Sequence, residues 1–157
     1  KRQGYFYLDY FARLCVMTEY GKLSVEEKMS FLKDVNIFSE TSEEFLLSMA
    51  TLLRGLKAKS QQNIFKKGDP GDAMHVIVSG KVLIQDGSHV LSRLHTNDFF
   101  GVFALIVVWP RSAYVSADEE TYVVRLSMDD FDARLSDDTG FARGILKVLI
   151  GRLRNLY

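Results

Sequence analysis

The chain lacks the residues that mark disulfide-rich or strongly charged proteins. Its 157 residues include one cysteine and two prolines, and 20 lysines and arginines balance 20 aspartates and glutamates. The single cysteine, Cys15, excludes an internal disulfide framework and is typical of a reducing compartment, so we expect a cytoplasmic location. Because Cys15 lies among apolar residues, we expect a buried structural thiol. The zero net charge provides no overall positive field that would attract nucleic acid.

Long hydrophobic runs are also missing. The longest apolar stretch, around residues 103–110, is far shorter than a membrane span, and no signal peptide is visible. A hydrophobic content of 47% and a charged content of 25% are typical of a soluble globular domain. The chain begins at Lys1 rather than methionine, so we expect it to be part of a longer polypeptide with flanking domains.

The N-terminal third of the chain has helical periodicity. A second helix is predicted to begin near Ser24 and a third near Thr41, because each has a glutamate three residues further on, the spacing of a capping box. Gly55 is predicted to end the third helix. Before them, a first helix is predicted from apolar residues three and four positions apart, at Tyr5, Leu8, Phe11, Ala12 and Cys15.

The C-terminal part is also predicted to be helical, with a short helix over 128–135 and a longer one from Thr139 to Tyr157. The longer helix has basic residues that we interpret as a solvated face, because no second helix follows to form a helix-turn-helix. Its apolar stripe is compatible with packing on the rest of the domain or with a homodimer, and both arrangements remain open. The stripe consists of Ile145, Leu146, Leu149, Ile150 and Leu153.

Residues 56–127 have the pattern of short strands joined by turns, which predicts an antiparallel barrel or jelly roll. The sequence Asp69-Pro70-Gly71-Asp72 has proline and glycine in the order of a type II turn and predicts a tight hairpin. Gly68, Gly71 and Gly80 are interpreted as structural turn glycines. The predicted strands cover residues 74–78, 81–85, 90–94, 112–117 and 121–126.

One segment combines the features of a phosphate site. Gly101 is predicted to open a short helical turn whose backbone N–H groups favour an anion. Arg111 follows in the same segment, and its guanidinium can hold phosphate oxygens in a fork. No pair of titratable groups is placed for acid–base chemistry, so we expect no enzyme. The histidines His75, His89 and His95 lack metal-ligand spacing and are predicted to be surface or half-buried residues.

Several motifs together resemble the cyclic nucleotide-binding domain family, which includes the catabolite activator protein and the protein kinase A regulatory subunits. They are the turn at Phe65–Asp72, the strand ending at Ser79-Gly80, the segment Asp98-Phe99-Phe100-Gly101, and Ala104-Leu105 before Pro110-Arg111-Ser112-Ala113. The resemblance covers about residues 30–157. It implies an α+β, mainly β, fold: an antiparallel β-roll with helices on both sides and a short helix within the phosphate cassette, residues 101–113.

The resemblance also implies a ligand site without metal or catalytic residues. Arg111 would pair with the exocyclic phosphate of cAMP or cGMP, unless it is an ion-paired loop residue. Backbone N–H groups around Ala104 and Leu105 would assist, and Ser112 and Ala113 would close the site. The full predicted ligand-binding set is Gly101, Val102, Phe103, Ala104, Leu105, Arg111, Ser112 and Ala113.

The cassette departs from the family pattern at three points. Where the family has a glutamate that accepts a hydrogen bond from the ribose, this chain has Val102, and the loss of roughly 1.5–3 kcal/mol predicts an affinity about ten- to a hundredfold lower. The apolar run 106–109 replaces polar turn residues. Because this run is costly in water, we expect it to fill the pocket, cover it as a lid or dock on a partner, with Trp109 as a packed anchor. Asn97 replaces a common glycine and tolerates a left-handed backbone.

These features predict a regulatory domain of a larger protein, with residues 1–36 as a helical lead-in or linker and 37–157 as the cyclic nucleotide-binding domain. Ligand would favour a state in which the final helix packs on the site. The alternative is a degenerate domain that no longer binds nucleotide and serves as a protein interaction module. A weaker alternative is a different ligand in a more apolar pocket. We expect no nucleic-acid binding through this domain alone.

Overall fold

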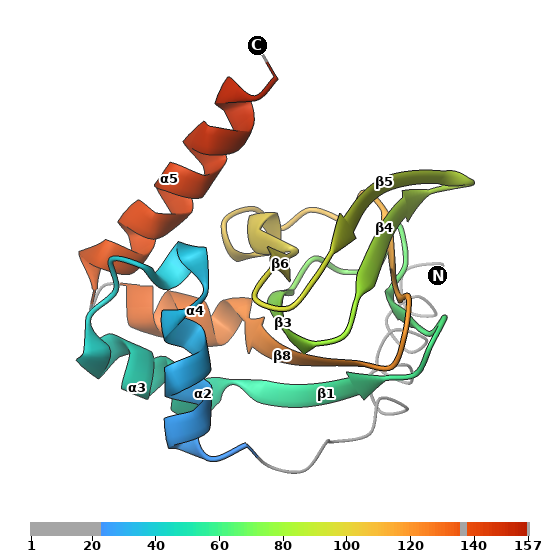
Figure 1. The fold of residues 1–157 in the computed structure, drawn as a ribbon. Helices are drawn as coiled ribbons and strands as arrows, with labels where there is room; N and C mark the ends of the chain where they lie inside the picture. Colours follow the sequence, from blue (N-terminus) through green and yellow to red (C-terminus); the bar gives the residue numbers. More distant parts are fainter. Residues whose placement is uncertain (1–22, 136–137, 157) are drawn as a thin grey trace, which may run out of the picture. The chain divides into compact units, whose positions relative to one another are not determined.

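The computed structural model describes residues 23–135 and 138–156, so the first predicted helix and Cys15 lie outside the described residues. The described chain forms two compact units, a β unit at Arg54–Met128 and a helical unit at 23–53 together with 129–156. Figure 1 labels the elements of both. None of the helices in the two described ranges has the length and apolarity that a membrane span requires.

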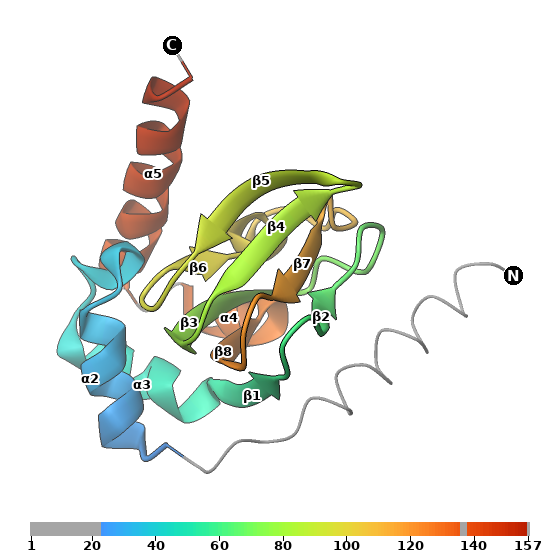
Figure 2. The same ribbon diagram turned by 45° about the vertical axis from the view of Figure 1, so that its right-hand side comes forward.

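The β unit consists of two four-stranded antiparallel sheets, which Figure 2 shows as two layers. The first sheet has the order β1 (Arg54–Ala58), β8 (Thr121–Ser127), β3 (Ala73–Ser79) and β6 (Phe99–Phe100). The second has the order β2 (Asn63–Phe65), β7 (Tyr114–Ala117), β4 (Val82–Asp86) and β5 (His89–Leu94). The core contains residues of both sheets, among them Leu56, Phe65, Ile77, Phe100, Val115 and Val123. The predicted antiparallel β-roll is confirmed.

All five predicted strands are present, with ends shifted by one or two residues. The strands β1, β2 and β6 were not predicted, because β2 and β6 are too short to show periodicity. The prediction that Gly55 ends a helix was wrong, since the helix ends at Leu52 and Gly55 lies within β1. A side chain at position 55 would collide with the ring of Tyr122, so this glycine serves the packing of the sheet.

The hairpin predicted at Asp69–Asp72 was also wrong. The strands on its two sides, β2 and β3, lie in different sheets and do not pair. The turn lies slightly earlier, where the Asp69 amide donates to the Lys66 carbonyl at 3.0 Å and Gly68 has a φ of 88°. Gly68 therefore supplies the left-handed residue that a type II turn requires. Asn97 has a φ of 71°, as its predicted tolerance of this conformation allows.

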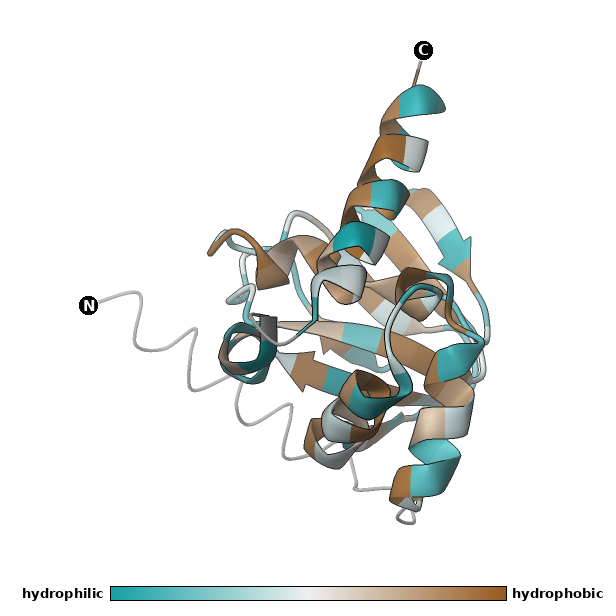
Figure 3. Ribbon diagram, turned by 90° about the vertical axis from the view of Figure 1, so that its left-hand side faces the viewer, coloured by the Kyte–Doolittle hydropathy of each residue, from teal (hydrophilic) through white to brown (hydrophobic). Residues whose placement is uncertain are grey.

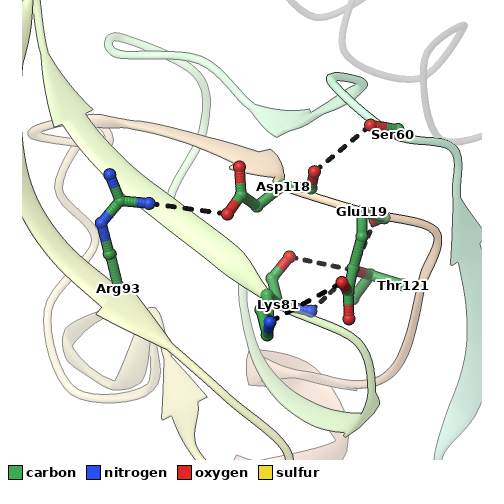
Figure 4. Close-up of polar contacts among 6 residues, drawn as sticks. All are labelled: Ser60, Lys81, Arg93, Asp118, Glu119 and Thr121. Atoms are coloured by element: carbon green, nitrogen blue, oxygen red, sulfur yellow. Dashed lines mark hydrogen bonds and ion pairs between the residues drawn. The ribbon is translucent and has the colours of Figure 1, made fainter.

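A polar network joins both sheets at the turn between β7 and β8 (Figure 4). The buried Thr121 hydroxyl lies 3.0 Å from the Lys81 carbonyl oxygen and 2.8 Å from that of Glu119. Arg93 of β5 pairs with the Asp118 carboxylate at 3.5 Å. The Thr121 hydroxyl thus satisfies two partly buried backbone carbonyls. The surface ion pair adds little stability.

The helical unit contains α2 (Val25–Lys33), the 3₁₀ turn η1 (Asn36–Phe38), α3 (Glu43–Leu52), α4 (Met128–Leu135) and α5 (Thr139–Arg154). Phe141 is fully buried, and its ring lies 4.9, 5.6 and 5.3 Å from the rings of Phe38, Phe45 and Phe131. Gly144 allows close approach, because a side chain there would meet the Ile37 carbonyl oxygen. An aromatic cluster of this kind dominates the packing energy of a small helical unit.

The helix starts follow from side-chain caps. Ser24 and Glu27 form the predicted capping box of α2. The cap of α3 is Ser42 rather than Thr41, and its hydroxyl donates to Asp138 at 2.5 Å. Asp138 in turn caps α5 by accepting from the Phe141 amide at 3.1 Å. One carboxylate thus joins the starts of α3 and α5.

Candidate functional site

The cassette begins with the turn that the sequence predicts. Gly101 has a φ of 76° and caps the 3₁₀ turn η2 (Val102–Leu105), and its carbonyl accepts from the Ala104 amide at 3.1 Å. Val102, Ala104 and Leu105 are buried, whereas Phe103 is exposed. Val102 has no polar atom in its side chain, so this turn offers no carboxylate to a sugar hydroxyl.

Arg111 lies inside the β unit with its side chain against this turn. It is 7% exposed, its Nη2 donates to the Ala73 carbonyl at 2.5 Å, and its guanidinium carbon lies 4.1 Å from the centre of the Phe65 ring. A Cβ atom built on Gly101 would lie 2.7 Å from Arg111 Nη1. Glycine is therefore favoured at position 101 for two reasons: its φ is positive, and a side chain there would crowd the Arg111 guanidinium. The structure brings these two predicted site residues together.

The turn before β3 holds the backbone of Arg111. The Arg111 amide donates to the Asp69 carbonyl at 2.8 Å, and the Gly68 amide donates to the Arg111 carbonyl at the same distance. The buried Asp69 carboxylate accepts from the Lys66 amide at 2.7 Å and fixes the turn. Gly71 lies against the Trp109 carbonyl, where any side chain would collide. The predicted structural role of these glycines is confirmed at positions 68 and 71.

Two charged residues that the sequence analysis missed lie beside Arg111. The Asp72 carboxylate pairs with Arg125 Nη2 at 2.9 Å and with Arg111 Nη2 at 3.9 Å. Arg125 occupies a position of β8 whose neighbours are apolar, Val124 and Leu126. A charged residue within an apolar strand was the available signal, because such a residue needs a partner inside the protein.

His75 corrects the prediction of a surface or half-buried histidine. It is 1% exposed, its ring stacks on Phe100 at 5.1 Å, and neither ring nitrogen has a hydrogen-bond partner among the described residues. Burial, and then the charges of Arg111 and Arg125, lower the pKa of His75 well below 6.5. The ring is therefore neutral at physiological pH. No group of three or more metal-binding side chains occurs in the described part of the chain.

The apolar part of the cassette corrects a second prediction. Phe103, Ile106, Val108 and Trp109 are 56%, 52%, 73% and 68% exposed. Trp109 is thus no packed anchor, and the run does not fill a pocket within the β unit. Two contacts hold the backbone of the run 106–109. The Val107 amide donates to the Phe103 carbonyl at 2.9 Å, and the Trp109 carbonyl packs against Gly71. These constraints direct the side chains outward.

The last two predicted site residues differ in burial. Ser112 is exposed, and Ala113 is buried just before β7. Ala104, from the cassette turn, lies near Gly71 and so beside the loop that carries Arg111. Two residues of the predicted set, Phe103 and Ser112, are thus exposed, Gly101 is half-buried, and the other five are buried.

Comparison with known proteins identifies the family of this domain. The sequence profile of the cyclic nucleotide-binding domain matches residues 56–138, more than half of the chain. The chain belongs to the cyclic nucleotide-binding domain family. The matched range includes every residue of the cassette and the turn at 66–72 that supports it. The family is one of binding domains, which agrees with a non-catalytic role for this region.

Three relatives illustrate the similarity. The chain is 34% identical over 110 residues to a cAMP-dependent protein kinase regulatory subunit of Dictyostelium discoideum, covering 65% of this chain and 34% of that protein. It is 32% identical over 111 residues to a cGMP-dependent protein kinase of Toxoplasma gondii, covering 71% and 11%. The regulatory domain of Toxoplasma gondii PKA, solved with cAMP, has the same fold, with a TM-score of 0.69, 23% identity and coverage of 85% and 50%. The chain thus spans 34% and 11% of the lengths of these two curated relatives.

Proposed function

We propose that this domain binds a cyclic nucleotide and that Arg111 holds its phosphate at the turn Gly101–Leu105. The position of the Arg111 guanidinium carries the proposal. Its Nη2 is anchored on the Ala73 carbonyl, and its Nη1 lies directly at Gly101, where the turn begins. A guanidinium fixed in this way loses little conformational entropy when it binds a phosphate oxygen. The similarity to a cAMP-dependent protein kinase regulatory subunit and to a cGMP-dependent protein kinase supports cAMP or cGMP as ligand.

We expect Val102 to lower the affinity of the domain for a cyclic nucleotide. A carboxylate at this position would accept a hydrogen bond from a hydroxyl of the ligand, and valine cannot. The contribution of such a charged hydrogen bond is roughly 1.5–3 kcal/mol, so we expect binding about ten- to a hundredfold weaker than with glutamate.

We further propose that the domain regulates a larger protein by moving α5. Leu146, Ile150 and Leu153 are more than half exposed on this helix, and Figure 3 shows hydrophobic and hydrophilic residues alternating around it. The cassette exposes a second apolar surface at Phe103, Ile106, Val108 and Trp109. Packing of the α5 stripe on this surface would remove both from water. Ligand would favour that state to the extent that it binds the packed form more tightly.

Calorimetric titration with cAMP and with cGMP tests the binding. Wild-type protein should bind at least one of them, and Arg111→Ala should abolish binding. Arg93→Ala is the matched control, because Arg93 is an exposed arginine of the same unit whose partner is Asp118. Equal affinities of wild type and Arg111→Ala would disprove the role of Arg111, and no binding by the wild type would disprove the function.

The exposed cassette favours one alternative function, a protein interaction module without nucleotide. Four exposed apolar side chains, those of Phe103, Ile106, Val108 and Trp109, occur within seven residues of the chain. Apolar residues that are exposed singly need no explanation, whereas a group of them is typical of an interaction site. In that case Trp109→Ser would abolish assembly with the partner or with a second copy, without changing the stability of the isolated domain. Sedimentation analysis tests the case of a second copy: a wild-type dimer that is lost in Trp109→Ser would support the interaction module, and monomers in both proteins would count against self-assembly through this surface.

A further inference from the structure

The N-terminal half of α5 anchors this helix to the helical unit. Phe141 is fully buried in the aromatic cluster, Gly144 packs against the Ile37 carbonyl, and Ile145 is 3% exposed. Residues 150–156, by contrast, are all exposed, and Figure 1 shows α5 extending past α2, α3 and α4 of the same unit. The C-terminal half of α5 therefore presents its side chains to the surroundings of the protein.

Three aliphatic side chains lie along the exposed side of α5. Leu146, Ile150 and Leu153 are 58%, 54% and 56% exposed. They are four and three residues apart, so they occupy one face of the helix. Leu156 follows on this side and is 78% exposed. An apolar face of this length is unfavourable in water and indicates an interaction surface.

Cations border this apolar face. The segment 139–157 contains four basic residues and no aspartate or glutamate. The four are Arg143, Lys147, Arg152 and Arg154. Because an α-helix turns about 100° per residue, Arg152 falls on one border of the face and the other three fall on the opposite border. Lys147 forms an ion pair with Glu40, and the three arginines are exposed. The surface is thus apolar in the middle and positive on both sides.

The charge and the composition of this surface distinguish between its occupants. A second copy of α5, in either orientation, would bring arginines of both helices together at the borders, where like charges repel. The centres of protein interfaces are enriched in aromatic residues and methionine, whereas this face consists of leucine and isoleucine. An anionic bilayer matches both features, since its acyl chains accept aliphatic side chains and its headgroups accept the arginines, whose stems can extend upward.

We propose that α5 docks in the interface of an anionic membrane, with Leu146, Ile150 and Leu153 at the acyl boundary and the bordering arginines at the headgroups. A flat lipid surface leaves the opposite face of the helix packed on η1 through Gly144. The proposal does not depend on the binding of a cyclic nucleotide. It concerns the state in which α5 is not packed on the cassette.

Co-sedimentation of the full chain with lipid vesicles tests the proposal. The wild type should bind vesicles of phosphatidylcholine and phosphatidylserine, bind vesicles of phosphatidylcholine alone more weakly, and lose affinity as the salt concentration rises. Ile150→Asn should weaken binding about tenfold, because it removes an apolar side chain from the acyl boundary. Arg154→Gln should weaken it about fivefold, the contribution of one cation near an anionic surface.

Matched variants outside α5 serve as controls. Leu91→Asn changes a leucine of β5 that is 60% exposed, and Arg93→Gln changes an exposed arginine of the same strand. Both should bind vesicles like the wild type. Thermal unfolding shows that each variant is folded, and Arg154→Gln serves if Ile150→Asn is not.

Three results would overturn the proposal. The first is a wild type that does not bind the phosphatidylserine vesicles, or that binds both kinds of vesicle equally. The second is binding that persists in Ile150→Asn and is lost in Trp109→Ser, which would assign the membrane contact to the cassette. The third is a wild-type dimer in sedimentation velocity without lipid that Ile150→Asn dissociates, which would assign the apolar face to a second copy.

Discussion

Acidification should destabilise the β unit through His75. The pKa of this histidine is well below 6.5 in the folded state, because of burial and of the charges of Arg111 and Arg125. In the unfolded chain it returns to about 6.5. Between these values the unfolded state binds more protons than the folded state, so stability falls as the pH falls. The His75 contribution is complete above pH 6.5 and decreases below it.

The expected magnitude follows from proton linkage. At pH values below 6.5 and above the folded pKa, each pH unit costs up to about 1.4 kcal/mol, the free-energy equivalent of one pKa unit. The carboxylates of Glu40 and Glu43 also have lowered pKa values, caused first by hydrogen bonds from Lys147 and Lys33. Their contribution is lost only below about pH 4.5.

Urea unfolding at a series of pH values, followed by circular dichroism, measures this dependence. His75→Phe is the informative variant, because a phenyl ring can stack on Phe100 and has no proton to bind. The variant should lose the decrease in stability between pH 7 and pH 5 that the wild type shows. Identical pH dependence in the two proteins would show that His75 is not the titrating group and would refute the reasoning.

Three further predictions concern packing and the cassette. Phe141→Ala should lower the free energy of unfolding by about 3–5 kcal/mol, since it removes the centre of the aromatic cluster; a loss below about 1 kcal/mol in urea unfolding would contradict that role. Gly101→Ala should lower stability by about 1–3 kcal/mol and weaken cyclic nucleotide binding, because it strains a φ of 76° and crowds Arg111; calorimetry and thermal unfolding that match the wild type would argue against it. Trp109→Ser should change stability by no more than about 0.5 kcal/mol, because the indole is exposed, and a larger loss in urea unfolding would mean that the side chain is packed.

Local patterns predicted much of this structure. The starts of α2 and α5 follow from neighbouring residues, such as the capping pair Ser24 and Glu27. The turn at Gly101 and its neighbour Arg111 also follow from a motif within one short segment. These features depend on interactions over a few residues, which a sequence displays directly.

The failures involve contacts between distant residues. His75 has apolar neighbours on both sides, Met74 and Val76, which is the pattern of a strand buried on both faces and was the overlooked signal for its burial. The pairing of Asp72 with Arg125 joins residues far apart in the chain and has no local signature. Trp109 was expected to be packed because indoles usually are, but the backbone of its loop directs it outward.

Phosphorus NMR of cAMP is the most direct test of the central claim, that Arg111 holds the phosphate of a cyclic nucleotide. Addition of wild-type protein should shift or broaden the phosphorus resonance in a saturable way. The same concentration of Arg111→Ala should leave it unchanged, and Arg93→Ala should behave like the wild type. A phosphorus resonance that responds equally to wild type and Arg111→Ala, or to neither, would contradict the claim.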